Sequence, residues 1–372
     1  MIRPDADVLA IIVARIGDTL LATPALRALK AAIPQGRLTV LAHPKRLEVL
    51  QHLPFIDVLE AITKTSAPAR GWIGKNRYDV ALVYGHDAAL VRYALRASDG
   101  VIAFPQRDAA LNRRLAHLVE EPSEPQHAVL HRLSLLAPLG LVAAGDLRLA
   151  SLGLAAENLR PASLGLAAGD LRLASLGLAA GDLRLAYCVT GEERTWARQW
   201  LATQVPPGRP LIGLQLASFP TKAHRDWPVS SFQDLMARIA AVRAEARFLL
   251  LGDAAAAVKA APLLAACPQQ AALAAGRLSL RQSAALMAEL DLYIGVDTGP
   301  THLAGALGIP IVALYHCAYP GRNLAPLQHP ACAVIEHPLT GKSAATTASM
   351  ADIPVAAVWQ AAMDLLARGV RP

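Results

Sequence analysis

The chain has 372 residues and a formal net charge of +7 at pH 7; 54% of its residues are hydrophobic and 5% are aromatic. This length exceeds what one hydrophobic core usually holds, so we expect two domains with a cleft between them. The charge is modest and contains no dense basic run. It therefore argues against nucleic acid as a partner and favours an anionic substrate or an anionic membrane surface.

The cysteines and the apolar runs narrow the class of protein further. The four cysteines lie far apart and form no Cys-x-x-Cys pair, so we expect reduced thiols and no zinc site. The first apolar run, Val8 to Ala14, is too short for a signal peptide, and polar residues and prolines interrupt the stretch from Tyr293 to Tyr315. The sequence therefore predicts a cytoplasmic protein without a membrane-spanning helix.

In chain order, apolar runs alternate with helical patterns. The run from Val8 to Ala14 predicts a strand, which a glycine turn at 15–19 and a helix from Leu20 to Leu29 follow. Strands at 38–42 and 80–84 continue this βαβ order, which gives a parallel sheet. The pattern restarts after Pro210, with strands at 211–216, 248–251, 292–296 and 309–314 and helices at 230–242 and 355–367.

This restart predicts an α/β protein of two Rossmann-like domains, one over residues 1–186 and one over 187–372, whose last helix can pack on either domain. Residues 143–178 hold a repeat with a period of twelve residues, beginning AAGDLRLASLGL. That period is shorter than the periods of solenoid repeats. We therefore interpret the repeats as an insertion without a chemical role.

The first motif, Arg15-Ile16-Gly17-Asp18-Thr19, follows the first strand, at the edge where open α/β sheets bind ligands. Asp18 is a candidate general base at this edge, and the alternative is that it caps the helix. Gly17 serves the turn under both interpretations.

Two further polar loops follow strands in the second half. Asp297-Thr298-Gly299-Pro300-Thr301-His302 offers a hydroxyl, backbone N–H groups and a helix amino terminus, which together suit a pyrophosphate. Lys222-Ala223-His224-Arg225-Asp226-Trp227-Pro228 offers cations that can neutralise a diphosphate. The alternatives are an ordinary capped turn for the first loop and a solvated loop anchored by Trp227 for the second.

Together with the helix TPALRALK and the stretch DTGPTHLAGALG, these three loops resemble glycosyltransferase family nine, the bacterial heptosyltransferases of lipopolysaccharide core synthesis. The resemblance covers nearly the whole chain apart from the repeats. It implies a GT-B fold, in which two Rossmann-like domains face each other across a cleft. It also implies inverting transfer of a hexosyl or heptosyl unit without a metal or other cofactor.

The resemblance also implies partners and roles. The expected donor is a nucleotide sugar, ADP-heptose first, and the expected acceptor is an anionic glycolipid reached by peripheral contact with the cytoplasmic face of the inner membrane. Asp18 matches the base that removes the acceptor proton. Arg225 stands at the basic position two residues before Trp227, and with Lys222 it would stabilise the leaving diphosphate. Four residues match the donor-diphosphate loop: Asp297, Thr298, Gly299 and His302.

The sequence departs from the family pattern at two places. Ala256 stands where the family has a glutamate for the nucleotide ribose, so Asp253 is the candidate substitute. Tyr315-His316-Cys317-Ala318 replaces the expected Gly-Pro-Thr turn, which points to a different base or sugar pocket. For acceptor binding we expect Gly17 and cations of the first half to contact acidic groups: Lys75, Arg77, Arg107, Arg113 and Arg114.

Three alternatives differ from this interpretation. A GT-B transferase with another donor shares all these features, because fold does not determine substrate. A non-catalytic homologue that binds a sugar nucleotide or glycan would not need the intact Asp18 and Asp-Thr-Gly. An NAD-dependent oxidoreductase would need Gly-x-Gly-x-x-Gly after the first strand, which the sequence lacks.

Overall fold

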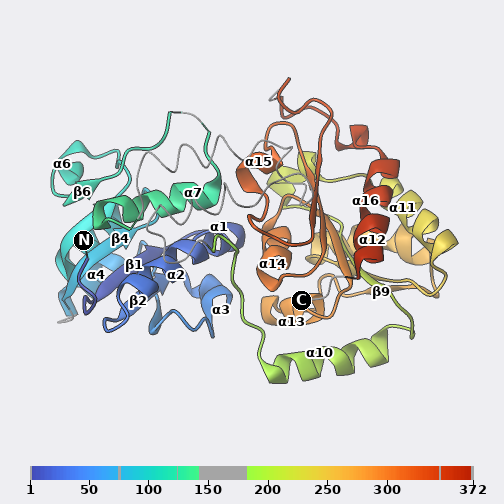
Figure 1. Cartoon of the computed structure of the whole chain (residues 1–372), viewed down its shortest axis with the longest axis horizontal. Helices are drawn as coiled ribbons and strands as arrows, with labels where there is room; N and C mark the ends of the chain where they lie inside the picture. Colours follow the sequence, from blue (N-terminus) through green and yellow to red (C-terminus); the bar gives the residue numbers. More distant parts are fainter. Residues whose placement is uncertain (1, 74–76, 124, 142–181, 343–344, 370–372) are drawn as a thin grey trace. The chain divides into compact units, whose positions relative to one another are not determined.

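The computed structural model describes residues 2–73, 77–123, 125–141, 182–342 and 345–369 (Figure 1). The chain divides into two compact units, residues 1–187 and residues 188–372. The predicted repeat insertion at 143–178 lies outside the described residues. Each unit is built around its own parallel sheet of six strands.

The sheet of the first unit has the strand order β3-β2-β1-β4-β5-β6. Its strands are β1 (Val8–Ile12), β2 (Leu38–Ala42), β3 (Val58–Ala61), β4 (Tyr78–Val83), β5 (Ser98–Ala103) and β6 (His117–Leu118). Helix α5 covers β4 and β5, α4 packs on α5, and α2 packs against α7. The helices are α1 (Ile16–Leu20), α2 (Thr23–Ala32), η1 (Pro44–Arg46), α3 (Leu47–Leu50), α4 (Ala67–Ile73), α5 (Ala88–Ala97), α6 (Ala109–Asn112), α7 (Ala128–Leu133) and η2 (Ser134–Leu139).

The sheet of the second unit has the order β12-β11-β10-β7-β8-β9. Its strands are β7 (Leu211–Gln215), β8 (Arg247–Leu251), β9 (Ala271–Leu273), β10 (Leu292–Val296), β11 (Ile311–Tyr315) and β12 (Cys332–Glu336). Figure 1 shows α11, α12 and α16 on one face of this sheet and α13 and α14 on the other, with α10 packed on α13. The helices are α10 (Gly191–Gln204), η4 (Pro220–Arg225), α11 (Val229–Val242), α12 (Ala254–Ala266), α13 (Leu280–Met287), α14 (Gly299–Leu307), α15 (Gly321–Leu324), η5 (Met350–Asp352) and α16 (Val355–Arg368).

Both sheets reverse their strand order at the centre. In the first unit β1 pairs with β2 on one side and with β4 on the other, and in the second unit β7 pairs with β8 and with β10. The connections that leave β1 and β4 therefore turn to opposite sides, as do those that leave β7 and β10. In open α/β sheets such a reversal marks the ligand-binding position at the carboxyl edge. This edge is where ligands bind in open α/β sheets, so the loops after β1 and β4, and after β7 and β10, are the places to look for chemistry.

The start of α1 corrects the prediction of a glycine turn. The structure places Ile16 at the first position of α1, directly after the extended backbone of Arg15, so Gly17 is the second residue of a helix. Its φ is not among the positive values of the described chain. Because an L-residue can adopt helical φ and ψ, the turn itself does not require a glycine at this position.

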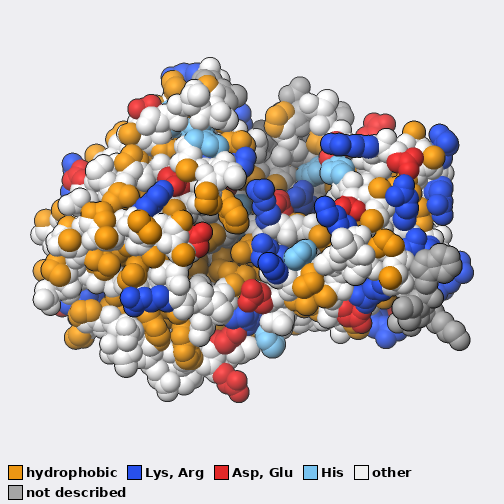
Figure 2. Space-filling view, turned by 180° about the vertical axis from the view of Figure 1, so that it is seen from behind, with side chains coloured by type: hydrophobic (Ala, Val, Ile, Leu, Met, Phe, Trp, Pro, Cys, Tyr) orange, Lys and Arg blue, Asp and Glu red, His pale blue; other side chains and the backbone are white. Residues whose placement is uncertain are grey.

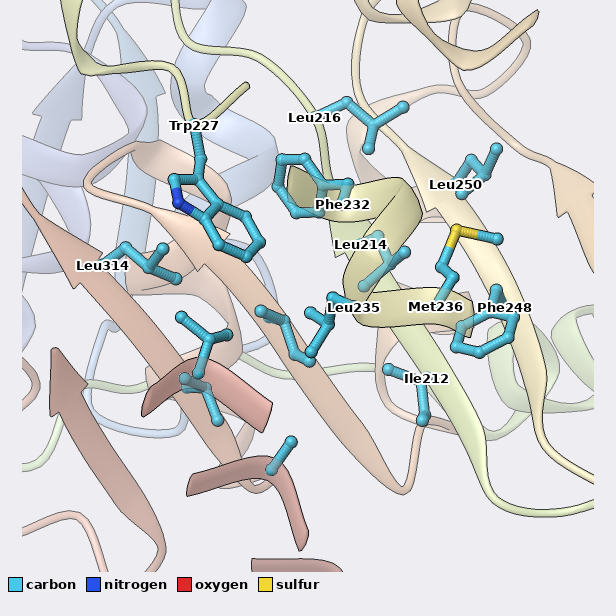
Figure 3. Packing of buried hydrophobic residues seen from close by; sticks show 14 of the residues in the cluster. Ile212, Leu214, Leu216, Trp227, Phe232, Leu235, Met236, Phe248, Leu250 and Leu314 are labelled. Carbon is cyan, nitrogen blue, oxygen red and sulfur yellow. The ribbon is translucent and has the colours of Figure 1, made fainter. Parts of the chain in front are cut away.

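Apolar side chains of α11 and of strands β7, β8 and β11 fill the core of the second unit (Figure 3). Trp227, in the loop before α11, is 1% exposed, and its ring meets Phe232 edge-on at a centroid distance of 4.9 Å. Its indole Nε1–H donates to the carbonyl of Ile353, 3.2 Å away, before α16. Trp227 therefore anchors the basic loop by packing, as the sequence suggested.

The exterior is mixed in character. On the face shown in Figure 2, Lys and Arg side chains are interspersed with acidic, hydrophobic and neutral ones. Phe219, 66% exposed, is the most prominent aromatic side chain on the surface of the described chain. No helix among the described residues is long and apolar enough to cross a bilayer.

We expect Trp227→Ala to lower the free energy of unfolding by about 3–5 kcal/mol, because it removes a buried indole and leaves the Ile353 carbonyl without this donor. Urea unfolding measures this loss. Val258→Ala is the control, since Val258 is 77% exposed and its truncation should change stability by less than about 0.5 kcal/mol. Equal effects of the two substitutions would contradict the anchoring role.

Candidate functional site

At the carboxyl edge of the second sheet, the loops after β7 and β10 bring three predicted site residues together. Arg225 Nη1 donates to Asp297 Oδ2 at 2.6 Å, and His302 Nε2 lies 3.7 Å from Asp297 Oδ1. Asp297 is 5% exposed and the Arg225 side chain 14%. A buried carboxylate is costly unless it is paired, so the Arg225–Asp297 pair fixes both side chains beside the switch point.

Tyr319, after β11, completes this group and was not predicted from the sequence. The Arg225 guanidinium carbon lies 3.6 Å from the centre of the Tyr319 ring, and the Lys222 ammonium lies 5.5 Å from it. Arg225 and Lys222 together hold the pKa of the Tyr319 phenol below its ordinary value. The Nε–H of Arg225 is buried and finds no hydrogen-bond partner among the described residues. The group therefore offers two cations and an uncommitted donor, which suits an anionic ligand.

Helix α14 begins beside this group. Pro300 contributes no N–H, and the amides of Thr301 and His302 both donate to the carbonyl of Thr298. Thr298 precedes the helix without a side-chain cap, and its hydroxyl donates to the Val296 carbonyl. What α14 offers an anion is thus its dipole and the Gly299 amide, and not the full series of N–H groups that we expected from the sequence.

Asp253, the predicted ribose contact, follows β8 at the same edge of the sheet and precedes α12. Its Oδ1 accepts from the amides of Ala255 and Ala256 at 3.0 and 3.1 Å, which caps α12. Gly252 before it has φ +137°, a backbone conformation that favours glycine, and a Cβ there would lie 2.3 Å from the Cβ of Ala256. The sharp exit from β8 therefore needs this glycine, and Asp253 has a structural task of its own.

At the switch point of the first sheet, Asp18 lies in the first turn of α1. The cap position is Arg15, with no side-chain cap, so the alternative that Asp18 caps the helix is wrong. Its Oδ1 instead accepts from Arg132 Nη2 of α7 at 3.1 Å. The Asp18 side chain is 44% exposed and that of Arg132 is 18% exposed, so the carboxylate is held by a largely buried cation and is still reachable.

The residues around Arg132 were also missed by the sequence analysis. His131 Nδ1 lies 2.9 Å from Arg132 Nη1, and Glu121 Oε1 lies 3.6 Å from His131 Nε2 and 3.2 Å from His86 Nε2. Burial, together with the neighbouring Arg132, lowers the pKa of His131 to about 4. His131 is therefore neutral near pH 7.

The predicted acceptor cations lie at different edges. Arg77 precedes β4 and pairs with Asp99 at the amino edge of the sheet, so the structure does not bring it together with Asp18. Arg107 follows β5 at the carboxyl edge and is exposed, as are Arg113 and Arg114 after α6. Lys75 lies outside the described residues. Among the residues that the structure describes, no three His, Cys, Asp or Glu side chains are grouped to hold a metal ion.

Comparison with known proteins shows that the chain is similar to glycosyltransferases. Residues 174–351 match the family model "Glycosyltransferase family 9 (heptosyltransferase)". A solved glycosyltransferase of family 9 from Veillonella parvula covers 99% of both chains at 18% identity with a TM-score of 0.73. The ADP-heptose lipopolysaccharide heptosyltransferase II of E. coli covers 97% of this chain and 99% of its own at 20% identity, with a TM-score of 0.68. The E. coli heptosyltransferase WaaC with ADP covers 96% and 99% at 15% identity, with a TM-score of 0.63.

No curated protein sequence matches the chain. At the identities of the solved structures the alignments show the fold, and the family model supports the family resemblance. The predicted fold class, two parallel α/β sheets of the GT-B type, and the predicted resemblance to the heptosyltransferase family are both confirmed.

We expect Arg225→Met to lower the free energy of unfolding by about 3 kcal/mol, because it leaves the buried Asp297 carboxylate without its partner. Adding Asp297→Asn should recover part of that loss. Urea unfolding of the single and double variants gives the interaction energy between Arg225 and Asp297. Arg238→Met is the matched control, since Arg238 and Asp234 form an exposed pair at 2.9 Å whose loss should cost less than about 1 kcal/mol. Equal losses for Arg225→Met and Arg238→Met would show that burial adds nothing.

The pKa of His131 predicts a pH dependence of stability. Because folding lowers this pKa from 6.5 to about 4, the native state binds fewer protons between these pH values, and stability falls as the pH drops through that window. The full loss is about 3 kcal/mol. His131→Asn keeps an acceptor near the position of Nδ1 and should flatten the curve of unfolding free energy against pH. His117→Asn, which changes an exposed histidine, should leave its slope as in the wild type.

Proposed function

We propose that this chain, with its match to glycosyltransferase family 9 and its GT-B fold, is an inverting glycosyltransferase. The transferred sugar is a heptose from ADP-heptose, and the acceptor is a lipopolysaccharide core or a related anionic glycan. The observation that supports this most is a pair of complementary groups. The switch point of the first sheet carries an exposed carboxylate, Asp18. That of the second sheet carries the cation Arg225, which is paired with Asp297, beside the amino end of α14.

The group on the second unit fits the diphosphate of a nucleotide sugar. Arg225 and Lys222 would neutralise charge on the diphosphate as the bond to the sugar breaks, and the amino end of α14 would add its dipole. Asp297 would hold Arg225 and His302 in place, while Asp253 is the candidate contact for the ribose. ADP in the WaaC structure supports a nucleotide donor here.

The chemistry we propose is a single displacement. The acceptor hydroxyl oxygen attacks the anomeric carbon, and Asp18 takes the hydroxyl proton as the new bond forms. The bond between that carbon and the diphosphate oxygen breaks, and the nucleoside diphosphate leaves with the electron pair. Attack opposite to the leaving group inverts the anomeric configuration. This step needs no metal or cofactor, because the charge on the leaving group is met by Arg225 and Lys222.

On the acceptor side, we propose that Arg107 and the backbone around Gly17 bind acidic groups of the glycolipid, because they lie at the same sheet edge as Asp18. With a glycolipid acceptor, we expect the protein to act in the cytoplasm, at the surface of the inner membrane. The net charge of +7 favours such an anionic surface.

The test is turnover of a panel of sugar nucleotides, ADP-heptose included, with deacylated lipopolysaccharide core acceptors, followed by released nucleoside diphosphate and product mass. Wild type should transfer a sugar, and Asp18→Asn should lower kcat about 10²–10⁴-fold because it removes the general base. Asp5→Asn is the control, since Asp5 is exposed and lies before β1.

The outcomes separate the remaining alternatives. A productive donor other than ADP-heptose would keep the class of enzyme and change the substrate. Binding of ADP without turnover of any donor would support a non-catalytic homologue instead. Full activity of Asp18→Asn would refute the assignment of the base.

A further inference from the structure

The guanidinium of Arg132 bridges two acceptors in the first unit. Its Nη2 donates to Asp18 Oδ1 at 3.1 Å, and its Nη1 lies 2.9 Å from His131 Nδ1. Arg132 belongs to α7, which packs against α2. Leu130 and Leu133 of the same helix are buried. The Arg132 side chain is thus held by its helix and by contacts at both of its Nη atoms.

The chemistry of the two groups fixes the tautomer of His131. A guanidinium can only donate hydrogen bonds, so Nδ1 of His131 is the acceptor and the ring proton sits on Nε2. Nε2 faces Glu121 Oε1 at 3.6 Å. The ring also stacks on Phe104, with centroids 4.3 Å apart and planes inclined by 14°. Phe104 is 2% exposed, so the imidazole is held against a rigid surface.

We propose that Arg132, anchored by neutral His131, is a positioning residue that orients the Asp18 carboxylate for the acceptor hydroxyl. This inference rests on the proposed role of Asp18 as the base. Arg132 occupies Oδ1, and no other described side chain of this unit is hydrogen-bonded to the carboxylate. Oδ2 is therefore the oxygen left to receive the acceptor proton.

The arrangement explains why an arginine is used. A lysine ammonium is a point charge on a flexible stem, whereas the planar guanidinium sets the angle between the His131 and Asp18 contacts. Because Asp18 is 44% exposed, a pair with Arg132 contributes little to stability. The pair acts instead by orienting the Asp18 carboxylate. A general base must be held within hydrogen-bond reach of the proton that it removes, and small displacements slow the reaction steeply.

The decisive variants are Arg132→Ala and Arg132→Lys, assayed with the donor and acceptor that the wild type turns over. Arg132→Ala should lower kcat about 100-fold with the KM for the donor unchanged, because only the orientation of the base is lost. Arg132→Lys should recover part of kcat. Added guanidinium ion should restore the Arg132→Ala variant by filling the vacated site, and methylammonium should not. Arg92→Ala, which removes an exposed arginine paired with Asp108, is the matched control.

Crystal structures of the two variants provide a readout that does not depend on turnover. The Asp18 carboxylate should leave its wild-type orientation in Arg132→Ala. Arg132→Lys should hold it only in part, because an ammonium can donate to Asp18 without setting the angle of the contact. An unmoved Asp18 in Arg132→Ala, or a kcat within about threefold of the wild type without any effect of guanidinium, would overturn the proposal. If Asp18→Asn keeps full activity, the proposed base fails, and the crystal structures still decide whether Arg132 orients this carboxylate.

Discussion

Parallel strand pairing is the constraint on which the candidate sites depend. Every strand of each sheet runs in the same direction, so the carboxyl ends of all six meet at one edge. Short loops at that edge lie close together even when their residues are far apart in sequence. In each sheet the connections that leave two neighbouring strands, β1 and β4 or β7 and β10, turn to opposite sides. The segments after these strands lie where open α/β sheets bind ligands. Asp18 and Asp297 both lie at such a position.

The groups around Arg225 and Asp18 are both built on a pair of an arginine and an aspartate, but the more buried partner differs. In the second unit a buried carboxylate, Asp297, holds the cation Arg225, and the ring of Tyr319 lies against the flat face of the guanidinium. In the first unit a largely buried cation, Arg132, holds the carboxylate Asp18, and the ring of His131 supports the other end of its fork. In both cases an aromatic or imidazole ring restricts the guanidinium, so little conformational entropy remains to be lost when a ligand binds.

Several residues outside the two groups stabilise the elements that carry them. Asp79 accepts from the Asp7 amide at 2.8 Å and pairs with Arg3 at 2.7 Å, which ties β4 to the start of β1. His127 caps α7 by accepting from the Val129 amide at 3.1 Å, and Ser279 begins α13 with a capping box. The cap of α7 also fixes the start of the helix that carries His131 and Arg132. These residues support the sites by fixing the elements on which the site residues stand.

The sequence by itself determined the elements and their order. The strands at 38–42 and 292–296 match β2 and β10, and α11 and α16 begin and end within one residue of the predicted helices, because apolar periodicity is a local property. It also located the segments after β1, β7 and β10 that carry Asp18, Arg225 and Asp297, since polar residues that follow a parallel strand lie at its carboxyl edge. Tertiary structure alone decided the partners. Arg132 is 114 positions from Asp18 in the sequence, and Tyr319 is 94 positions from Arg225. No local pattern records such pairs, because the fold of the sheet, and not the spacing along the chain, brings their side chains together.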